Sequence, residues 1–413
     1  MKKEFFATNR KKVMEQVEDN SIVILFAGEA PQKSADEAYQ FTPNRNFYYL
    51  TGISREKMIL MLTKINNKVE ETLFIEKSDP VLAKWIGERM SSEEAKELSG
   101  IADIQYLEDF EAKCNRLVLT YDMQNAYLDL ERRDYNSLLT KAQSFAGEIN
   151  GKYPSLRVKN IYNVLFNLRA VKTEEEVENI RKAIEITHSG IKNAVSNMKP
   201  GMVEYEIEAY FDFTLKCSGV TDKAFNTIAA SGANATVLHY SQNNTKTKDG
   251  DLILFDLGAQ WNYYNGDISR TFPLNGKFTE RQKEIYNIVL KAQLATIEAI
   301  KPGVPFTRLN EITREVLAEG LIGLGIIKES SELSKYYYHG VSHHLGLDTH
   351  DVGSREAELQ PGMLLTVEPG LYIPEENIGI RIEDDVLVTE NGNENLSKDI
   401  MKTVEEIEAF MSK

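Results

Sequence analysis

The second half of this 413-residue chain contains a weak internal repeat, which constrains the fold more than any other feature of the sequence. The tripeptide Lys-Pro-Gly ends one helical segment at residues 199–201 and another at 301–303, an offset of 102. A second amphipathic helix follows each tripeptide, over residues 205–219 and 307–321. Short periods typical of solenoids are absent, so the repeat indicates two related halves of one domain.

A histidine-bearing segment and a pair of β-patterned runs complete each copy of the repeat. His239 lies in the first copy and His343 in the second, 104 residues later. The β-patterned runs cover residues 251–258 and 263–272 in the first copy, and residues 363–373 and 378–389 in the second. Two helices and a β-hairpin, present twice, predict an α+β domain with pseudo-twofold symmetry and a site on its axis.

Residues 1–168 have a different pattern, in which short apolar runs alternate with helical segments. The runs are bounded by turn residues and indicate strands at 21–28, 58–65 and 71–77, whereas residues 91–100 have a helical pattern. This alternation predicts a smaller α/β domain. We interpret the aromatic run NFYYLTG at residues 46–52 as a strand that enters the core of this domain, with a ligand-facing surface as the alternative.

A capping box marks the start of the second domain. Thr173 is followed three residues later by Glu176, and a long amphipathic helix continues from there. We therefore predict a boundary between an N-terminal α/β domain at residues 1–168 and a larger domain at residues 172–413. His188 lies on the apolar face of this helix, so we interpret it as a core histidine rather than a ligand.

Composition narrows the class of protein. The net charge of −15 argues against a nucleic-acid partner, because such binding usually needs a basic surface. Cys114 and Cys217 lack a CxxC spacing and cannot form a disulfide framework, which favours a reducing compartment. The charged N-terminus does not have the pattern of a signal peptide, and no apolar run is long enough to span a membrane. We therefore expect a soluble, cytoplasmic protein.

Four acidic residues in the β-patterned runs follow the repeat: Asp256, Asp267, Glu368 and Glu383. Asp256 and Glu368 each interrupt an apolar strand, where a buried acid is costly unless a cation or a partner meets it. The offsets are 112 residues from Asp256 to Glu368 and 116 residues from Asp267 to Glu383. The symmetry therefore predicts that all four acids meet at the centre of the domain, with His343 beside them.

Four carboxylates and one imidazole form a ligand set for hard or borderline metal ions. Two divalent cations would neutralise the repulsion between the acids, and Mn²⁺ is the first candidate, followed by Co²⁺ or Zn²⁺. Two such ions can share a water molecule, lower its pKa and polarise a carbonyl group, which is hydrolytic chemistry. The alternative is that the acids cap loops or pair with Arg270 and Arg381.

Four of the six histidines lie within twelve positions: His339, His343, His344 and His350. Neutral imidazole binds metals and titrates near neutral pH. The cluster therefore indicates a metal or proton-transfer site, with a polar loop as the alternative.

Five separated segments resemble the aminopeptidase P (Xaa-Pro aminopeptidase) and prolidase group of metallopeptidases, which have the pita-bread fold. They are TIAASGANATVLHY, LILFDLGAQWNYYNGDISRTFP, HGVSHHLGLDTHDVG, LLTVEPGLYI and IGIRIEDDVLVTENGNENL. The resemblance is strong over roughly residues 170–413 and looser in the N-terminal half, where TPNRNFYYLTGI is similar to the N-domain of that family. It implies a catalytic pita-bread domain at 172–413, preceded by the smaller α/β domain.

The resemblance also implies a role for each residue of the metal site. Asp256 would bind one metal ion, His343 and Glu368 would bind the other, and Asp267 and Glu383 would bridge both. Glu368 would in addition carry a proton to the leaving nitrogen.

Residues around the metal site receive roles from the same resemblance. His350 would donate a hydrogen bond to the substrate carbonyl, the group on which negative charge develops. His239 and His339 would line the substrate pocket, His239 with a catalytic part. Arg381 would orient the neighbouring metal ligand or contact polar groups of the substrate. We interpret His344 as a packing or solvent-facing residue.

The implied activity is hydrolysis of the bond between an N-terminal residue and a following proline, with prolidase, a Xaa-Pro dipeptidase, as the alternative. The partners would be peptides with proline at the second position, and we expect a homodimer or homotetramer. Creatinase-like amidine hydrolysis does not use this ligand set, and a binding-only relative would have lost ligands. Phe225 departs from the family, which commonly has a tyrosine there, so a hydrogen bond near the site would change.

Overall fold

The computed structural model describes residues 1–412 and divides the chain into two compact units. The first unit is Met1–Leu168 and the second begins at Arg169, within the helix α7 (Tyr162–Ala170). Within the described residues, no helix combines the length and the apolar character needed to cross a bilayer.

The first unit is built on a mixed sheet with the strand order β4-β3-β2-β1-β5-β6. β1 pairs antiparallel with β2 on one side and parallel with β5 on the other. The chain therefore extends the sheet first from one side of β1 and later from the other. The strands are β1 (Ser21–Phe26), β2 (Ile59–Ile65), β3 (Lys68–Ile75), β4 (Asp103–Tyr106), β5 (Asn125–Leu128) and β6 (Arg157–Asn160).

Helices pack on this sheet and enclose an apolar core. Ile24 of β1 and Leu128 of β5 belong to the same buried cluster as Phe110 and Leu117 of α5. The helices are α1 (Lys3–Gln16), α2 (Arg45–Thr51), α3 (Ala83–Ile86), α4 (Ser92–Ser99), α5 (Phe110–Tyr121) and α6 (Lys141–Lys152). The sheet and its helices form the α/β domain predicted from the alternating pattern.

The prediction of a strand at residues 46–52 is wrong, because these residues form the helix α2. Asn44 caps the helix by accepting a hydrogen bond from the Phe47 N–H at 2.8 Å, and Gly52 ends it at a φ of 70°. Almost every side chain of α2 is buried, so the run has no polar face. A continuous apolar run of this length does not distinguish a buried helix from a buried strand.

Each half of the second unit begins with a pair of helices. The first pair is α8 (Glu174–Asn197) and α9 (Glu204–Cys217), and the second pair is α10 (Glu280–Ala299) and α11 (Phe306–Gly323). The helices of each pair meet at a glycine, because a Cβ on Gly190 would collide with Phe211 and one on Gly320 with Ile288. The predicted capping box at the start of α8 is confirmed.

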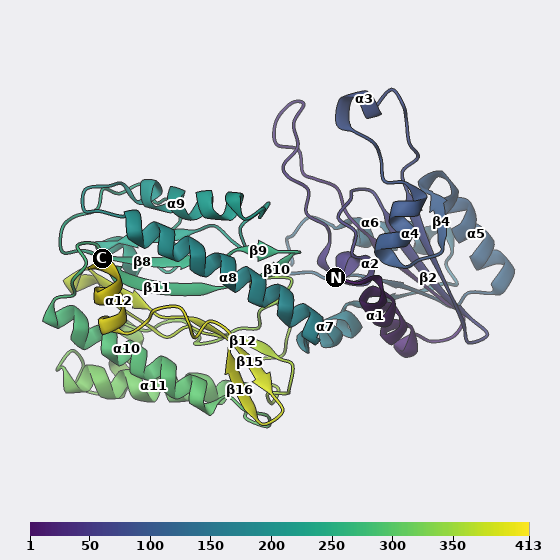
Figure 1. The fold of residues 1–413 in the computed structure, drawn as a ribbon. Helices are drawn as coiled ribbons and strands as arrows, with labels where there is room; N and C mark the ends of the chain where they lie inside the picture. Colours follow the sequence, from purple (N-terminus) through teal and green to yellow (C-terminus); the bar gives the residue numbers. More distant parts are fainter. Residues whose placement is uncertain (413) are drawn as a thin grey trace. The chain divides into compact units, whose positions relative to one another are not determined.

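The strands of this unit lie between the two helix pairs (Figure 1). In the first half, β8 (Leu252–Leu257) pairs antiparallel with β7 (Ile228–Ser231) and with β11 (Ile268–Pro273). The small hairpin of β9 (Gln260–Trp261) and β10 (Tyr264–Asn265) joins β8 to β11.

The two β-patterned runs of the second half pair with each other as predicted, and a break in the middle divides the hairpin into two ladders of the same register. Residues 363–373 divide into β12 (Leu364–Val367) and β13 (Gly370–Ile373), and residues 378–389 divide into β14 (Ile378–Arg381) and β15 (Asp384–Thr389). β12 pairs with β15, and β13 pairs with β14. The first run breaks at Pro369, which has no N–H to donate to a ladder. β16 (Gly392–Asn395) and α12 (Val404–Met411) follow.

Candidate metal centre

The strand register brings the acids of each half together. Asp256 lies on β8 opposite Ser269 of β11, and Asp267 directly precedes β11. In the second half, the ladder between β12 and β15 ends with the pair Val367 and Asp384. Glu368 and Glu383 are the next residues along these two strands, so they leave the ladder side by side at its end.

Main-chain and side-chain hydrogen bonds join the two halves at these acids. Ser269 accepts a hydrogen bond from the N–H of Glu383 on its carbonyl at 3.0 Å, and its hydroxyl donates to the Glu383 carboxylate at 2.8 Å. The N–H of Asp267 donates to Asp385 at 3.1 Å. The predicted meeting of the two halves at the centre of the domain therefore has a direct structural basis.

The imidazole of His343 is oriented toward the acids. Its Nδ1 lies 2.9 Å from the carbonyl oxygen of His344, and since a carbonyl can only accept, Nδ1 is the protonated nitrogen. The lone pair of Nε2 then faces Asp267 at 3.4 Å and Glu368 at 3.7 Å. Metal-binding histidines commonly have this arrangement, with one nitrogen fixed by the protein and the other directed at the ion.

Asp267, His343 and Glu383 each place one ligand atom within 4.8 Å of the others, which is close enough to hold one ion. Glu368 adjoins this group through its contact with His343. Asp256 approaches it from the other half, and its Oδ1 is buried without a hydrogen-bond partner among residues 1–412. A buried oxygen without a donor is costly, so this atom fits a metal ligand.

The electrostatics of the site favour bound cations. Burial, together with the charge of Asp256, raises the pKa of Asp267 well above its ordinary value, and burial with the charge of Asp267 does the same for Glu383. Burial raises the pKa of Glu368 to about 7, against the opposing effect of His343. Divalent ions favour the charged forms of these acids, so the residues present fit a metal site.

A cavity of about 470 Å³ opens onto the acids. Its lining contains all the site residues predicted from the sequence: His239, Asp256, Asp267, His339, His343, His350, Glu368, Arg381 and Glu383. The rings of His343 and His350 lie 4.4 Å apart, edge to face. Phe225 also lines the cavity.

Arg381 reaches both halves of the site. It was expected to orient Glu383 or to contact polar groups of the substrate, and its guanidinium donates to the Ser269 hydroxyl at 2.8 Å, which in turn donates to Glu383. It also donates directly to Asp256 at 2.6 Å, so the alternative pairing of an acid with Arg381 is found for this acid. Arg381 also donates to the Tyr372 hydroxyl at 3.1 Å, and that hydroxyl lies 2.8 Å from His339 Nε2.

Two histidines lie outside the cavity lining. His344 is buried and stacks on Phe306, with the two rings 5.5 Å apart, as expected of a packing residue. His188 on α8 is half-buried, and its Nε2 lacks a hydrogen-bond partner within the described part of the chain. Burial and the charge of Lys192 lower the pKa of His188, which keeps the ring neutral.

Sequence reasoning missed several residues that hold the site together. Ser269 binds both Glu383 and Arg381, and Asp385 accepts from the main chain of Asp267. A hydroxyl in a β-strand gives no signal of its own. The pair of acids that follows Glu383 in an apolar strand was a usable signal, because two adjacent buried acids both need partners.

Two related halves that converge on carboxylates, an oriented imidazole and a polar cavity define the protein as a metal-dependent hydrolase. Residues 178–390 match metallopeptidase family M24, and residues 6–127 match the aminopeptidase P N-terminal domain. The chain belongs to metallopeptidase family M24.

Individual relatives and solved structures agree with this assignment. The chain is 37% identical to the Xaa-Pro aminopeptidase of Escherichia coli K12, over 98% of this chain and 97% of that protein. A solved structure from Bacillus anthracis is 56% identical and superposes with a TM-score of 0.98, covering 100% of this chain and 99% of that one. Aminopeptidase P from E. coli with the inhibitor Pro-Leu superposes with a TM-score of 0.92 at 33% identity, covering 100% and 98%. The predicted α+β pita-bread fold with a smaller α/β N-terminal domain is confirmed.

Proposed function

We propose that this chain is a Xaa-Pro aminopeptidase, which hydrolyses the bond between an N-terminal residue and a following proline with the help of two divalent metal ions. The observation that carries the proposal is the convergence of Asp267, His343 and Glu383 within 4.8 Å at the base of the cavity. The relatives that match almost the whole chain and carry the name Xaa-Pro aminopeptidase support the substrate class.

Five residues would hold the ions. Asp256 would bind one, His343 and Glu368 the other, and Asp267 and Glu383 both. The unpaired Oδ1 of Asp256 and the free Nε2 of His343 support these assignments. When bound, the ions would polarise the scissile carbonyl and lower the pKa of a water molecule between them. Mn²⁺ is the first candidate, with Co²⁺ or Zn²⁺ as alternatives, because the set contains oxygen and nitrogen donors without thiolate.

Glu368 would move the proton that hydrolysis transfers to the leaving nitrogen. Its side chain is 18% exposed, whereas those of Asp267 and His343 are 6% exposed, so it has access to the cavity. In the metal-free protein, burial raises its pKa to about 7, and a bound ion would lower this pKa by favouring the carboxylate form that accepts the proton.

The histidines of the cavity would position the substrate. Burial and the charge of Arg381 lower the pKa of His339 to about 4, and burial with the neighbouring His343 lowers that of His350 to the same value, so both rings are neutral at neutral pH. His339 Nδ1 lies 2.8 Å from the Gly340 carbonyl and therefore carries the proton, while its Nε2 accepts from the Tyr372 hydroxyl, so of these two rings His350 keeps its N–H for the substrate. His350, next to His343, would donate to the substrate carbonyl oxygen, while His239 and His339 would contact the residues around proline.

The cavity is suited to a bond that ordinary proteases handle poorly. A peptide bond to proline has no N–H, so enzymes that recognise that proton lose a contact. Here the metal ions and His350 would act on the carbonyl group of the bond, which a bond to proline retains. Prolidase, the alternative activity, is disfavoured because the full-length relatives are aminopeptidases.

The test is to remove metal from the protein, restore Mn²⁺, and assay Arg-Pro-Pro beside Gly-Pro while following the released amino acids. We expect cleavage of the tripeptide after arginine, and no activity in the matched variant His343→Ala under the same conditions. Cleavage of the dipeptide alone would establish prolidase. If no divalent ion restores cleavage of either peptide, the proposal is contradicted.

We further propose that the protein acts in the cytoplasm as a homodimer or homotetramer. The reduced cysteines expected there fit the two free cysteines, Cys114 and Cys217. Cell fractionation and light scattering of the purified protein test these two points, and a monomer at working concentration would contradict the second.

A further inference from the structure

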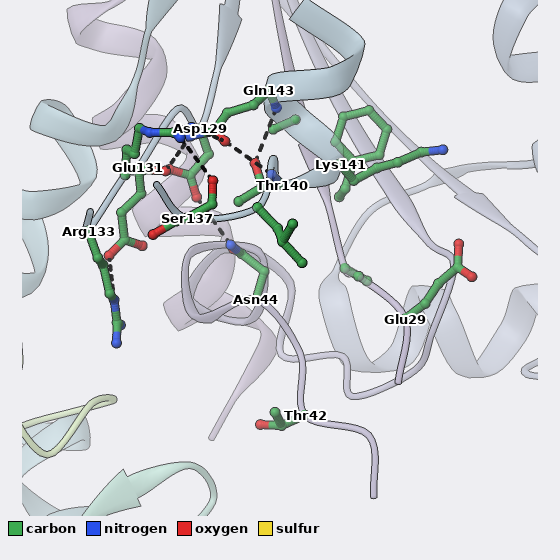
Figure 2. Close-up of a pocket in the computed structure, with 16 residues that line it drawn as sticks. Glu29, Thr42, Asn44, Asp129, Glu131, Arg133, Ser137, Thr140, Lys141 and Gln143 are labelled. Atoms are coloured by element: carbon green, nitrogen blue, oxygen red, sulfur yellow. Dashed lines mark hydrogen bonds and ion pairs between the residues drawn. The ribbon is translucent and has the colours of Figure 1, made fainter. Parts of the chain in front are cut away.

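A second cavity, of about 360 Å³, lies in the first unit at the carboxyl ends of β1 and β5 (Figure 2). Its lining includes residues 26–29 at the end of β1, Asp129 and residues 131–133 after β5, and residues 140–143 at the start of α6. β1 and β5 are parallel neighbours, and the sheet extends in opposite directions from them. In α/β proteins, the carboxyl ends of strands at such a switch point are where ligands bind.

One carboxylate oxygen of Asp129 in this cavity, Oδ1, has no hydrogen-bond donor among the described residues. The residue is 6% exposed, and its Oδ2 accepts from the side-chain amides of Asn46 at 2.9 Å and Asn44 at 3.3 Å. Its Oδ1 is buried and lacks a partner among the residues that the structure describes. Such an oxygen is costly to bury, and its strongest complement is a positively charged N–H group.

The amino end of α6 attracts negatively charged groups, whereas Asp129 attracts positively charged ones. Its capping box uses the N–H groups of Thr140 and Gln143 and leaves those of Lys141 and Ala142 outside it. A helix amino end carries partial positive charge and attracts anions. Lys141, an exposed residue of the cavity lining, adds a cationic side chain that begins at this helix end and extends away from Thr140 (Figure 2).

Three other charged groups of the lining are already engaged. The Arg132 guanidinium donates to the carbonyls of Tyr135 and Ser137, and Arg133 pairs with Glu131 at 3.3 Å. The features left to a ligand are therefore the buried acceptor at Asp129, the exposed carboxylate of Glu29 and an anion site at α6. Phe26 and Leu138 supply apolar wall between charged groups.

We propose that this cavity binds a free α-amino acid or a short peptide, with its ammonium group on Asp129 and its carboxylate at the amino end of α6 beside Lys141. A zwitterion satisfies the buried acceptor and the anion site at once. A nucleotide would present phosphate to α6 but no cation to Asp129, so it fits less well. The ligand class follows from the cavity alone and does not rest on the proposed peptidase activity.

Calorimetric titration of the metal-free full-length chain tests the proposal with three probes. L-leucine carries both charges, N-acetyl-L-leucine lacks the ammonium group and L-leucinamide lacks the carboxylate. We expect L-leucine to bind and each of the other two to bind at least about tenfold more weakly, the usual effect of losing one charge-assisted hydrogen bond.

Two variants connect the probes to the residues. Asp129→Asn should weaken L-leucine at least about tenfold and leave N-acetyl-L-leucine unchanged, whereas Lys141→Ala should weaken L-leucine severalfold and leave L-leucinamide unchanged. Asp134→Asn, in the same loop but outside the cavity lining, is the matched control and should bind like the parent chain. Any binding at the metal centre is common to all these proteins, so the differences report this cavity.

Three results would overturn the proposal. The first is no saturable binding of L-leucine, and the second is binding that neither variant changes. The third is binding of ADP that Lys141→Ala abolishes in a chain that does not bind L-leucine, which would make the cavity a nucleotide site. Circular dichroism of each variant checks the fold, and Lys141→Ala, at an exposed position, decides the matter if Asp129→Asn does not fold.

Discussion

Glu383 and Asp384 are adjacent in the chain, yet their carboxylates lie in opposite electrostatic settings. Arg270 donates to Asp384 at 2.6 Å and Lys402 pairs with it, and these two cations outweigh the effect of burial and lower its pKa to about 2. Burial and the charge of Asp267 instead raise the pKa of Glu383 well above its ordinary value. Side chains of neighbouring residues in an extended chain point to opposite sides, so these two carboxylates face different surroundings. Asp384 faces two cationic side chains of the protein, whereas Glu383 faces other acids.

The comparison separates structural acids from metal-binding acids. On the Asp384 side, each negative charge is met by a side chain of this protein, and the cluster stabilises the fold without further partners. On the Glu383 side, Asp256, Asp267 and Glu368 add negative charge, and Arg381 is the cation that reaches this group at Asp256. An excess of buried acid over buried base therefore marks the place that needs ions from outside the chain.

The largest effect on activity is expected for an acid on the Glu383 side, where the acids outnumber the cationic side chains. Asp267→Asn keeps the shape of the side chain but removes a charge that would hold both ions. Because Lewis-acid stabilisation contributes several kcal/mol, we expect the kcat for Arg-Pro-Pro to fall at least about a thousandfold. Steady-state kinetics with saturating Mn²⁺ measure this. Asp399→Asn, an exposed acid outside the cavity, is the control, and equal activity of the two variants would contradict the account.

On the Asp384 side, where cationic side chains of the protein neutralise the acid, the expected loss is in the free energy of unfolding. Arg270→Met leaves Asp384 buried beside Lys402 alone, and breaking a buried ion pair costs about 3–5 kcal/mol of unfolding free energy. Urea unfolding of the metal-free protein measures the change. Arg308→Met removes an exposed arginine that pairs with Glu311 and Glu315, and should change stability by less than about 1 kcal/mol. A loss of similar size in both variants would remove the distinction between the two sides.

The pH dependence of stability should differ between metal-free and metal-loaded protein. The pKa of Glu368 is raised from 4.5 to about 7 in the metal-free fold, so the folded state holds a proton that the unfolded chain has released. This contribution is present below pH 4.5 and is lost as the pH rises toward about 7. We expect the melting temperature of metal-free protein to fall across this window and that of Mn²⁺-loaded protein to fall less. Because the pKa values of Asp267 and Glu383 are raised as well, parallel curves would contradict the assignment of this group of acids to the metal site.

A smaller effect should distinguish two serines that bind the adjacent acids. Ser269 donates to Glu383 at 2.8 Å, and Ser397 donates to Asp384 at 2.9 Å. Loss of a residue that orients a metal ligand commonly weakens metal affinity about 10–100-fold, so we expect this range for Ser269→Ala. Ser397→Ala is the matched control and should leave metal affinity unchanged. Titration with Mn²⁺ measures both, and equal affinities would show that Ser269 does not orient a ligand.

Much of this arrangement was predictable because the repeat carries long-range information. The offsets between acids follow the offsets between helices, so symmetry alone predicted that Asp256, Asp267, Glu368 and Glu383 converge. The observed cavity contains all four. The helix pairs were predictable for a local reason, since Pro-Gly turns and apolar periodicity mark their ends.

Details that depend on three-dimensional neighbours were not predictable. The residues of α2 are buried on all sides, so they lack the periodicity that separates a helix from a strand. The ladder is interrupted at Glu368 and Glu383, and Arg381 pairs with Asp256 of the other half, a contact that no pattern within one half indicates. A sequence pattern shows which side chains need partners, but the fold decides which partners they receive.

The most direct test of the central claim is the number of metal ions bound per chain, measured by elemental analysis after reconstitution with Mn²⁺ and removal of free ion. The account predicts two ions in the parent chain, about one in Asp256→Asn, and two in the Arg270→Met variant, provided that it folds. A parent chain that hydrolyses Arg-Pro-Pro without bound metal, or an Asp256→Asn variant that retains both ions, would contradict the assignment of these acids to a dinuclear centre.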